Sequence, residues 1–242
     1  MNIVIPMAGR GSRFRDVGVD TPKPLIPVRD VPMYVWAMRS LPLELATRVI
    51  FICLQEHLEE LALKNDIMER YADFNPTIVS VDQVTEGQAC TVLLAREHIN
   101  DETPLVIYNA DTYCRSRLAD EIKSRPDADG FMTVFEAEGE KWSFARTNES
   151  GRIVETAEKK RISSLASTGL YHFSRGSDFV RYAEEMIDEN DRVNNEFYVA
   201  PVYNRMLEAD MKLYPDRAEE VWVLGTPEDL AYFEANYKNI EK

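Results

Sequence analysis

The chain has 242 residues, of which 45% are hydrophobic and 29% are charged, a composition typical of a soluble globular protein with a sizeable core. Its 42 acidic and 28 basic side chains give a formal net charge of −14, which repels nucleic-acid backbones and argues against nucleic acid as a partner. No apolar run approaches the roughly 20 residues of a membrane span, so we expect no membrane partner either.

The cysteines and the N-terminus indicate the compartment. Cys53, Cys90 and Cys114 are sparsely spaced and form no CxxC or Cys/His metal-binding pattern, so reduced thiols are expected. The N-terminus carries no basic segment, and its apolar run ends at Pro6, unlike a signal peptide. We therefore expect a cytoplasmic protein. The sequence leaves the oligomeric state open, a homo-oligomer included.

The first half of the chain predicts strands that alternate with helices. Strands are expected over residues 2–7, 48–54, 77–81 and 104–110, and helices over 31–41, about 56–71 and 87–98. The run at 48–54 is continuously apolar, as in a strand buried on both faces of a parallel sheet. This alternation predicts a doubly wound α/β sheet with right-handed crossovers.

The second half predicts shorter elements. Strands are expected over residues 130–136, 144–147, 153–155, 168–173 and 220–224, and helices over about 175–187 and 197–209. Thr226 and Pro227 supply an N-cap and a first helical position for one last helix. No repeat, low-complexity tract or linker interrupts the pattern, so we expect one domain over 1–242.

A loop over residues 8–14 follows the first strand and carries two glycines, a hydroxyl and two arginines. Gly9 and Gly11 lack the Cβ atoms that hold a backbone away from a phosphate, so consecutive N–H groups can point at one anion. Arg13 and Lys23 add positive charge. Phe14 stands where a dinucleotide fingerprint has its third glycine, and the P-loop spacing is absent. The alternative interpretation is a tight turn with solvated arginines.

Other polar groups follow expected strand ends, where open α/β sheets bind ligands. Lys23 lies between two prolines, which predicts an extended segment; a merely solvated lysine is the alternative. Asp111 follows a buried strand and has the chemistry of a Mg²⁺ ligand, since this ion binds one or two carboxylates together with substrate phosphates. An aspartate that caps a turn is the alternative there.

In combination these motifs resemble the nucleoside-triphosphate transferases, which include sugar-1-phosphate nucleotidyltransferases and cytidylyltransferases. Residues 7–14 with Pro22-Lys23-Pro24-Leu25 resemble the signature A-G-x-G-[ST]-R-[LMF]…P-K-P. Later landmarks of the family are resembled, in order, by Gln83 with Gly87-Gln88-Ala89, Asn109-Ala110-Asp111, Glu158-Lys159, residues 168–173 and residues 221–230. The resemblance spans most of the chain. It implies a single-domain GT-A or Rossmann-like α/β fold with a mostly parallel mixed sheet.

The resemblance also implies an activity. A Mg²⁺-dependent enzyme would transfer a nucleoside monophosphate, with CMP preferred, from a nucleoside triphosphate to a phosphorylated small molecule and release pyrophosphate. Such relatives often serve capsule or surface-polysaccharide synthesis. Residues from 1 to about 125 would form the nucleotide-binding half, and those from about 126 to 242 the acceptor-binding half.

Site residues carry over from the family position by position. The resemblance implies nucleotide binding by Ala8, Gly9, Gly11, Ser12, Gln83, Gly87 and Gln88, catalytic roles for Arg13, Lys23, Asp111 and Lys159, acceptor binding by Gly169 and Glu196, and metal binding by Asp111. Arg13 would bind the outer phosphates, Lys23 the α-phosphate and Lys159 the acceptor phosphate.

One position departs from the family pattern. A second metal-binding aspartate usually precedes the G-T-P of the closing segment, and Val223 stands there instead. Another carboxylate is then needed if the metal has two protein ligands, and Glu196 is the candidate; a glutamate near a helix N-terminus is the structural alternative.

Two other functions remain open. A glycosyltransferase of the related nucleotide-sugar fold should show a D-x-D motif, but the chain has Asn109-Ala110-Asp111. A non-catalytic nucleotide sensor would explain Val223.

Overall fold

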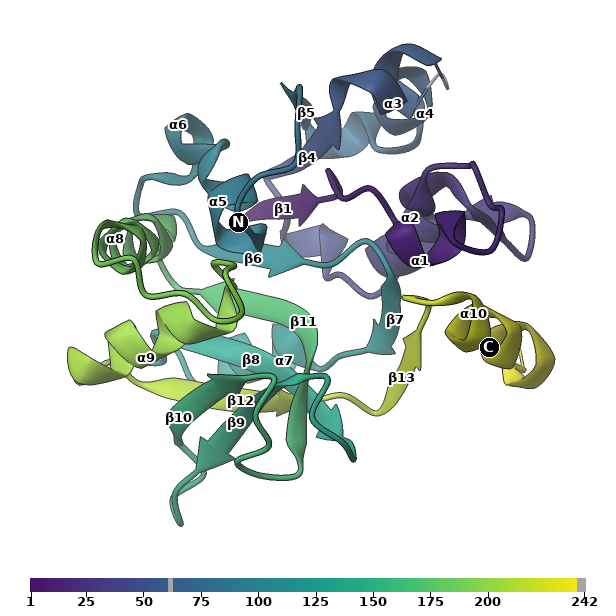
Figure 1. Ribbon diagram of the computed structural model, residues 1–242. Coiled ribbons are helices and arrows are strands. Elements are labelled where there is room, and N and C mark those ends of the chain that lie inside the picture. Colours follow the sequence, from purple (N-terminus) through teal and green to yellow (C-terminus); the bar gives the residue numbers. More distant parts are fainter. Residues whose placement is uncertain (61–62, 239–242) are drawn as a thin grey trace.

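The computed structural model describes the backbone of residues 1–60 and 63–238 (Figure 1). The strands are β1 Asn2–Pro6, β2 Pro27–Val28, β3 Val31–Pro32, β4 Arg48–Leu54, β5 Pro76–Val81, β6 Leu105–Tyr108, β7 Thr112–Arg115, β8 Gly130–Glu136, β9 Ser143–Thr147, β10 Ile153–Glu158, β11 Leu165–Phe173, β12 Leu213–Arg217 and β13 Glu220–Val223. The helices are α1 Ser12–Arg15, α2 Met33–Met38, α3 Gln55–Glu60, α4 Leu63–Arg70, α5 Gln88–Leu93, α6 Arg96–Ile99, α7 Leu118–Ser124, α8 Gly176–Asp188, α9 Ala200–Glu208 and α10 Pro227–Asn236. Short 3₁₀ turns cover Lys23–Leu25, Leu43–Leu45 and Ala72–Phe74.

A mixed sheet forms the centre of the molecule. Among the described residues, nine strands belong to it, in the order β10-β9-β11-β6-β1-β4-β5, with β8 beside β11 and β12 beside β8. The central pairs β6–β1, β1–β4 and β4–β5 are parallel, whereas β11 runs antiparallel to β6, β8 and β9. The sheet therefore continues from a parallel first half into a second half that is mostly antiparallel, where, among the described strands, only β12 and β8 pair in parallel.

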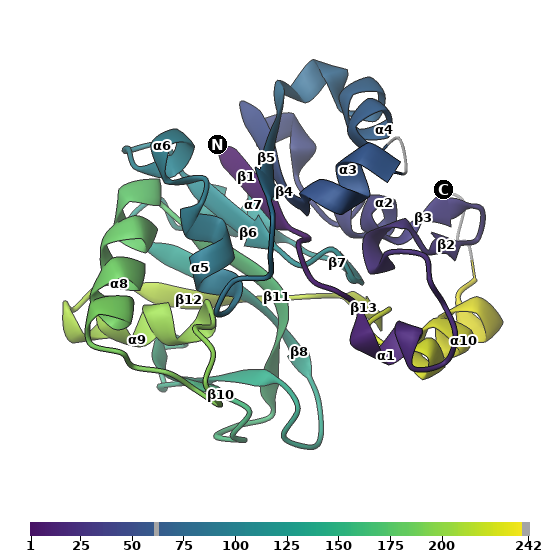
Figure 2. The same cartoon turned by 45° about the horizontal axis from the view of Figure 1, so that its top comes forward.

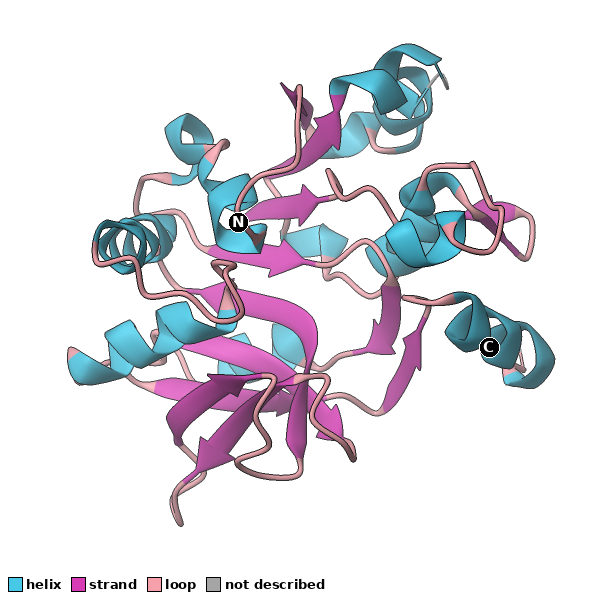
Figure 3. Ribbon diagram, viewed as in Figure 1, coloured by secondary structure: helices cyan, strands magenta, loops and turns pink. Residues whose placement is uncertain are grey.

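Helices cover both faces of this sheet (Figures 2 and 3). Because successive side chains of a strand point to opposite faces, Val4 packs in one core cluster with α5, α8 and α9. Ile3 and Ile5 pack in the other cluster, with α2, α4 and α7. Such burial on both faces explains the continuous apolar runs of β1 and β4.

The expected α/β class is confirmed, and most expected strands form at or near their predicted positions. Two expected helices are divided. The last turn of α5 tightens to i→i+3 bonds, from Leu94 N to Thr91 O and from Ala95 N to Val92 O, and the chain restarts as α6. The helix expected at about 56–71 forms as α3 and α4, and its residues 61–62 lie outside the described part of the chain. Thr226 does cap α10, where its side chain accepts from Asp229 N at 3.1 Å.

The sequence did not predict β7, β12 or α7. β12 contains Pro215 and Asp216, residue types that are depleted in strands. Asp216 is nevertheless fully buried and accepts hydrogen bonds from Ser116 Oγ at 2.5 Å and Thr133 Oγ1 at 2.8 Å. These long-range bonds offset the cost of burying the carboxylate, and no local pattern reveals them.

Two further expectations concern covalent state and membranes. Cys53, Cys90 and Cys114 are free thiols, as expected. Within residues 1–60 and 63–238, no helix combines the length and apolar character needed to cross a bilayer.

Candidate active site

A cavity of about 490 Å³ opens beyond the carboxyl ends of β1 and β6. This is the edge at which open α/β sheets bind ligands. Its lining includes most of the residues predicted from the sequence: Ala8, Gly9, Gly11, Ser12, Arg13, Lys23, Gly87, Gln88, Asp111 and Glu196. Gln83, Lys159 and Gly169, also described by the structure, are not part of that lining. The fold thus gathers into one cavity predicted residues that lie up to 188 positions apart in the chain, Ala8 and Glu196.

The two glycines of the N-terminal loop act in different ways. Gly11 has φ +62°, a left-handed conformation that favours glycine. A Cβ there would lie 2.8 Å from Lys23 Cβ, so the absence of a side chain lets the lysine pack closely. A Cβ at Gly9 would meet no atom within 4 Å. Since Gly9 lines the cavity, its missing side chain leaves room for a ligand instead.

The expected loop over residues 8–14 is wrong in its second part, because Ser12–Arg15 form the short helix α1. Gly11 O accepts from Phe14 N at 3.0 Å and from Arg15 N at 3.3 Å, which starts the helical turn. The N–H groups of Ser12 and Arg13 come before that of Phe14, the first to bond within the turn. They are donors without an intrahelical acceptor at the cavity wall.

Lys23 lies in a 3₁₀ turn rather than the expected extended segment. Leu25 N donates to Pro22 O at 2.8 Å, and the fixed φ of Pro24 suits this geometry. The turn directs the lysine across the cavity, where Lys23 Nζ donates to Asp111 Oδ2 in an ion pair. Both side chains are half-buried. These two groups therefore neutralise each other.

Asp111 connects β6 with the closing segment of the chain. Leu224 N donates to Asp111 O at 2.8 Å, which brings β13 and Gly225 beside it. A Cβ at Gly225 would lie 3.5 Å from Asp111 Oδ2 and 3.8 Å from Asp229 Oδ2. Two carboxylates thus flank one small gap at the cavity.

The residues at this point bear on the expected metal. Val223 pairs with Thr112 across β13 and β7 and offers no ligand atom. In the described part of the chain, no three His, Cys, Asp or Glu side chains are grouped as a metal site would need. Mg²⁺ commonly takes only one or two carboxylates, with phosphates and waters as its other ligands, and Asp111 with Asp229 matches that donor set. Asp229 was not predicted, although it belongs to the closing segment of the family pattern.

A pair of amide side chains lies next to the carboxylates. Gln88 Nε2 donates to Asn109 Oδ1 at 2.6 Å, and both residues line the cavity. Gly169 has φ +86°, and a Cβ there would lie 2.0 Å from Asn109 Nδ2. Gly169 therefore supports the site from behind by leaving space for Asn109. Asn109 was not predicted as a site residue, and its place two positions before Asp111 was the available signal.

Gly87 makes a close backbone contact at the same wall. Its φ is +135°, and a Cβ there would lie 2.4 Å from Phe197 O. The chain on either side is bonded across the gap, from Phe197 N to Glu86 O at 2.9 Å and from Ala89 N to Phe197 O at 3.0 Å. Glu196 directly precedes Phe197 and lines the cavity beside this contact. Gln83, in contrast, is exposed.

Lys159 lies outside the cavity lining and is held by its own neighbours. Its backbone has φ +51°, its N–H donates to Trp142 O at 2.9 Å, and its Nζ donates to the hydroxyl of Tyr198. Tyr198 in turn bonds to Glu196. Burial, and secondly this bond, raise the pKa of the Tyr198 hydroxyl. Tyr198 thereby links Lys159 to the cavity, a role for which the sequence carried no signal.

Glu158 precedes Lys159 and is almost completely buried. Its carboxylate accepts from Ser143 Oγ. Burial raises the pKa of this carboxyl group, with the charge of Glu196 acting in the same direction. Ser143 and Lys159 act against it.

A cavity of this kind, at the carboxyl edge of a parallel sheet with cations on one wall and carboxylates beside them, defines a nucleotide-handling α/β protein. A family profile described as nucleotidyl transferase matches residues 3–241. The chain therefore belongs to the nucleotidyl transferase family.

Individual relatives agree with this assignment. A protein of Lancefieldella rimae named 2-aminoethylphosphonate cytidylyltransferase is 27% identical over 243 residues, which cover 98% of this chain and 93% of that protein. The crystal structure of a nucleoside-diphosphate-sugar pyrophosphorylase from Vibrio cholerae has a TM-score of 0.84 and 27% identity, covering 97% of this chain and 100% of the other. An inositol-1-phosphate CTP transferase from T. maritima has a TM-score of 0.73 at 16% identity, covers 94% of this chain and 90% of its own, and supports the fold alone. The GT-A-like fold is thus confirmed.

Proposed function

We propose that this chain is a Mg²⁺-dependent nucleotidyltransferase that transfers CMP from CTP to a phosphorylated small molecule and releases pyrophosphate. We propose capsule or surface-polysaccharide precursors as its products. The observation that carries the proposal is the ion pair of Lys23 with Asp111 inside a cavity whose wall is the glycine loop. A cation for phosphate, a carboxylate for a metal and an open backbone wall meet there.

The reaction requires two anions to approach each other. An oxygen of the acceptor phosphate attacks the α-phosphorus of the triphosphate, one P–O bond forms, and the bond between α-phosphorus and the bridging oxygen breaks as pyrophosphate leaves. Two like charges about 4 Å apart repel by about 4 kcal/mol at the effective dielectric of a protein surface. The protein must therefore neutralise charge and align the reactants, and a phosphate dianion needs no general base.

The residues of the first wall are suited to the triphosphate. The amides of Gly9–Ser12 and the guanidinium of Arg13 would bind the β- and γ-phosphates, since they line one side of the cavity. Lys23 would leave Asp111 and bind the α-phosphate, where charge develops. Asp111, with Asp229 beside it, would hold Mg²⁺, which when bound neutralises phosphate charge.

Lys159 would hold the acceptor phosphate beside Glu196, to which Tyr198 links it. Its Nζ donates to Tyr198, so acceptor binding would exchange a neutral partner for an anionic one. A hydrogen bond to an ionised partner is roughly twice as strong as one to a neutral group, which favours the exchange.

Support for cytidine comes from one relative. The Lancefieldella rimae relative, similar along nearly the whole chain, is named for cytidylyl transfer. That relative is also named for a phosphonate with an amino group, so acceptors beyond sugar phosphates belong in any assay panel.

The test is pyrophosphate release with each of the four nucleoside triphosphates, Mg²⁺ and a panel of phosphorylated sugars, polyols, choline and aminoalkyl compounds. We expect release with CTP and one acceptor class. If no pair releases pyrophosphate above the rate without acceptor, the proposed function is wrong; if another triphosphate is preferred, only the cytidine assignment is wrong.

A further inference from the structure

Glu196 is presented to the cavity by a tight turn. Val193 and Glu196 exchange two backbone hydrogen bonds, each 3.0 Å long, and enclose Asn194 and Asn195. These two asparagines have φ values of +49° and +65°. Consecutive left-handed residues are typical of a type I′ turn, and asparagine adopts this conformation more readily than most residues. The backbone of Glu196 is therefore fixed by hydrogen bonds, which limits the positions that its carboxylate can take.

The turn is also held against the segment over residues 86–89, which carries Gln88. Arg192 Nη2 lies 3.2 Å from Glu86 Oε2, and its guanidinium lies 4.2 Å from the centre of the Phe197 ring. Phe197 N donates to Glu86 O at 2.9 Å, directly after Glu196. These contacts, from both sides of the turn, fix the place of Glu196 relative to Gln88 at the start of α5.

The charge at this wall is not balanced. Glu196 has the Tyr198 hydroxyl as a partner, but none of the ion pairs found within the described residues involves Glu196. Glu158 interacts with it repulsively. Lys159 donates to Tyr198, so two carboxylates face one lysine whose Nζ is already bonded. Arg13 and Lys23, which also line the cavity, carry its positive charge.

We propose that Glu196 binds a positively charged amino group of the acceptor, so that the substrates are aminoalkyl phosphates or phosphonates rather than sugar phosphates. This inference rests on the function proposed above and names its acceptor class. The acceptor phosphorus group would be held by Lys159, as proposed above, and its ammonium would lie toward Glu196. An ammonium supplies the charge that this wall lacks, whereas a sugar hydroxyl supplies only a neutral donor.

The test compares two acceptors that differ at one position. 2-Aminoethylphosphonate and propylphosphonate have similar length, and a methyl group replaces the ammonium in the second. With CTP and Mg²⁺ held constant, we expect kcat/KM at least tenfold higher for the amino compound. Glu196→Gln should reduce that preference to threefold or less, through the acceptor KM, and leave the KM of CTP unchanged.

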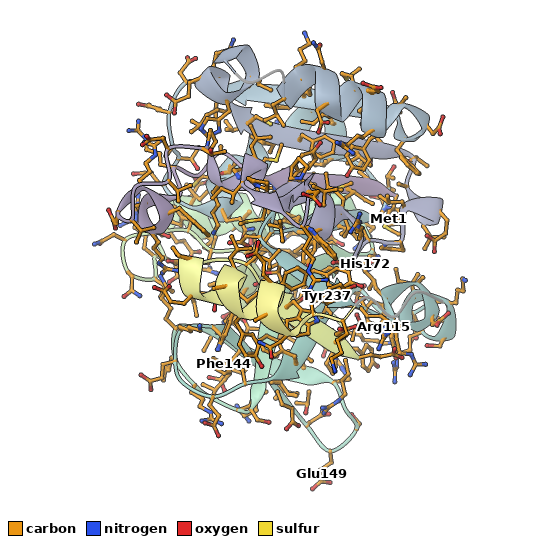
Figure 4. The ribbon with its side chains drawn as sticks, turned by 90° about the vertical axis from the view of Figure 1, so that its right-hand side faces the viewer. Met1, Arg115, Phe144, Glu149, His172 and Tyr237 are labelled. Carbon is orange, nitrogen blue, oxygen red and sulfur yellow. The ribbon has the colours of Figure 1, made fainter. Side chains whose placement is uncertain are left out.

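Glu149→Gln is the matched control. It removes the same charge at the tip of an exposed loop (Figure 4), outside the cavity lining, and should keep the full preference. Thermal unfolding of both variants checks that the fold is retained. Isothermal titration of each acceptor into the CTP-bound protein without Mg²⁺ measures the preference independently of turnover.

Several outcomes would overturn the inference. Equal binding and turnover of the two phosphonates would do so, as would a preference that survives Glu196→Gln. A variant with weakened Mg²⁺ dependence for every acceptor would assign Glu196 to the metal instead. Turnover of sugar 1-phosphates alone would refute the acceptor class and leave nucleotidyl transfer intact. An amino preference in titration that Glu196→Gln removes, without any pyrophosphate release, would support the recognition and refute the transfer.

Discussion

The two walls of the cavity are built by different means. On the nucleotide wall, Gly9, Gly11 and Asp111 follow the parallel neighbours β1 and β6, so sheet topology alone brings them together. On the proposed acceptor side, Glu196 is carried by a turn before α9. Lys159, a left-handed residue after β10, lies outside the cavity lining and is linked to Glu196 through Tyr198. The first wall is a property of the fold, whereas the second depends on local turns that sequence changes can alter readily. This division suits a family in which one nucleotide chemistry serves many acceptors.

Asp111→Asn tests the nucleotide wall at its centre. We expect turnover to fall by about a thousandfold, because a correctly held metal contributes several kcal/mol to charge stabilisation. Pyrophosphate release measured against Mg²⁺ concentration checks this. Asp229→Asn is the comparison, with a smaller loss and a higher Mg²⁺ requirement. A normal Mg²⁺ response in Asp111→Asn would place the metal elsewhere.

Lys23→Ala should lower kcat by about 10²- to 10³-fold, as for other single groups that stabilise transition-state charge. The melting temperature should change little, because the lysine is half-buried and its ion pair is partly solvated. Arg10→Ala removes a positive side chain of the glycine loop that is exposed and outside the cavity lining; it is the matched control and should retain turnover. Unchanged turnover in Lys23→Ala would remove its proposed role.

Gly169→Ala asks whether the second half supports the nucleotide wall. Alanine would have to adopt the left-handed backbone of this position, and its Cβ would clash with Asn109 Nδ2. We therefore expect a loss of about 2 kcal/mol of unfolding free energy together with weaker nucleotide binding. Denaturant unfolding of this variant, Asn109→Ala and the double variant measures the coupling. Relief of the clash should make the double variant more stable than additivity predicts. Strict additivity would contradict the contact.

His172→Leu probes β11, which joins the parallel and antiparallel parts of the sheet. Burial, aided by the N-terminal ammonium, lowers the pKa of His172 to about 3 (both groups are labelled in Figure 4). Its ring nitrogens have no hydrogen-bond partner among the described residues. Between pH 6.5 and 3 the imidazole of His172 is therefore protonated in the unfolded chain but neutral in the folded chain. The free energy of unfolding falls as the pH decreases from 6.5 toward 3.

At pH 5 this linkage costs about 2 kcal/mol, which His172→Leu should remove. Denaturant unfolding at pH 7 and pH 5 measures the difference. Phe131→Leu, which changes the ring packed against His172, is the control and should lower stability equally at both pH values. An unchanged pH dependence in His172→Leu would show that another group is responsible.

The nucleotide wall was the more predictable of the two. The apolar runs of β1 and β4 and the glycines after β1 carry their own signals, because burial on both faces and close backbone approach each demand particular residue types. Short-range geometry was less predictable. α1 and the 3₁₀ turn at Lys23 replaced a loop and an extended segment, since a few local bonds decide between such states.

Contacts between distant segments left no local pattern. β12 forms around Asp216 because Ser116, directly after β7, and Thr133 of β8 satisfy that buried carboxylate. Asn109 takes its place because Gly169 lacks a Cβ, and Asp229 lies near Asp111 because β13 pairs with β7. Each depends on a partner far along the chain, which a reading of neighbouring residues does not contain.

The sequence by itself determined the α/β class, the glycine loop, and the residue types of the proposed phosphate and metal site. These follow from residue chemistry and from the periodicity of burial, which are local properties. Only the tertiary structure decided that Lys23 pairs with Asp111, that Gln88 bonds to Asn109, and that Glu196 enters the cavity while Lys159 does not line it. Those outcomes depend on the three-dimensional path of the chain, and therefore on free energies that many distant contacts share.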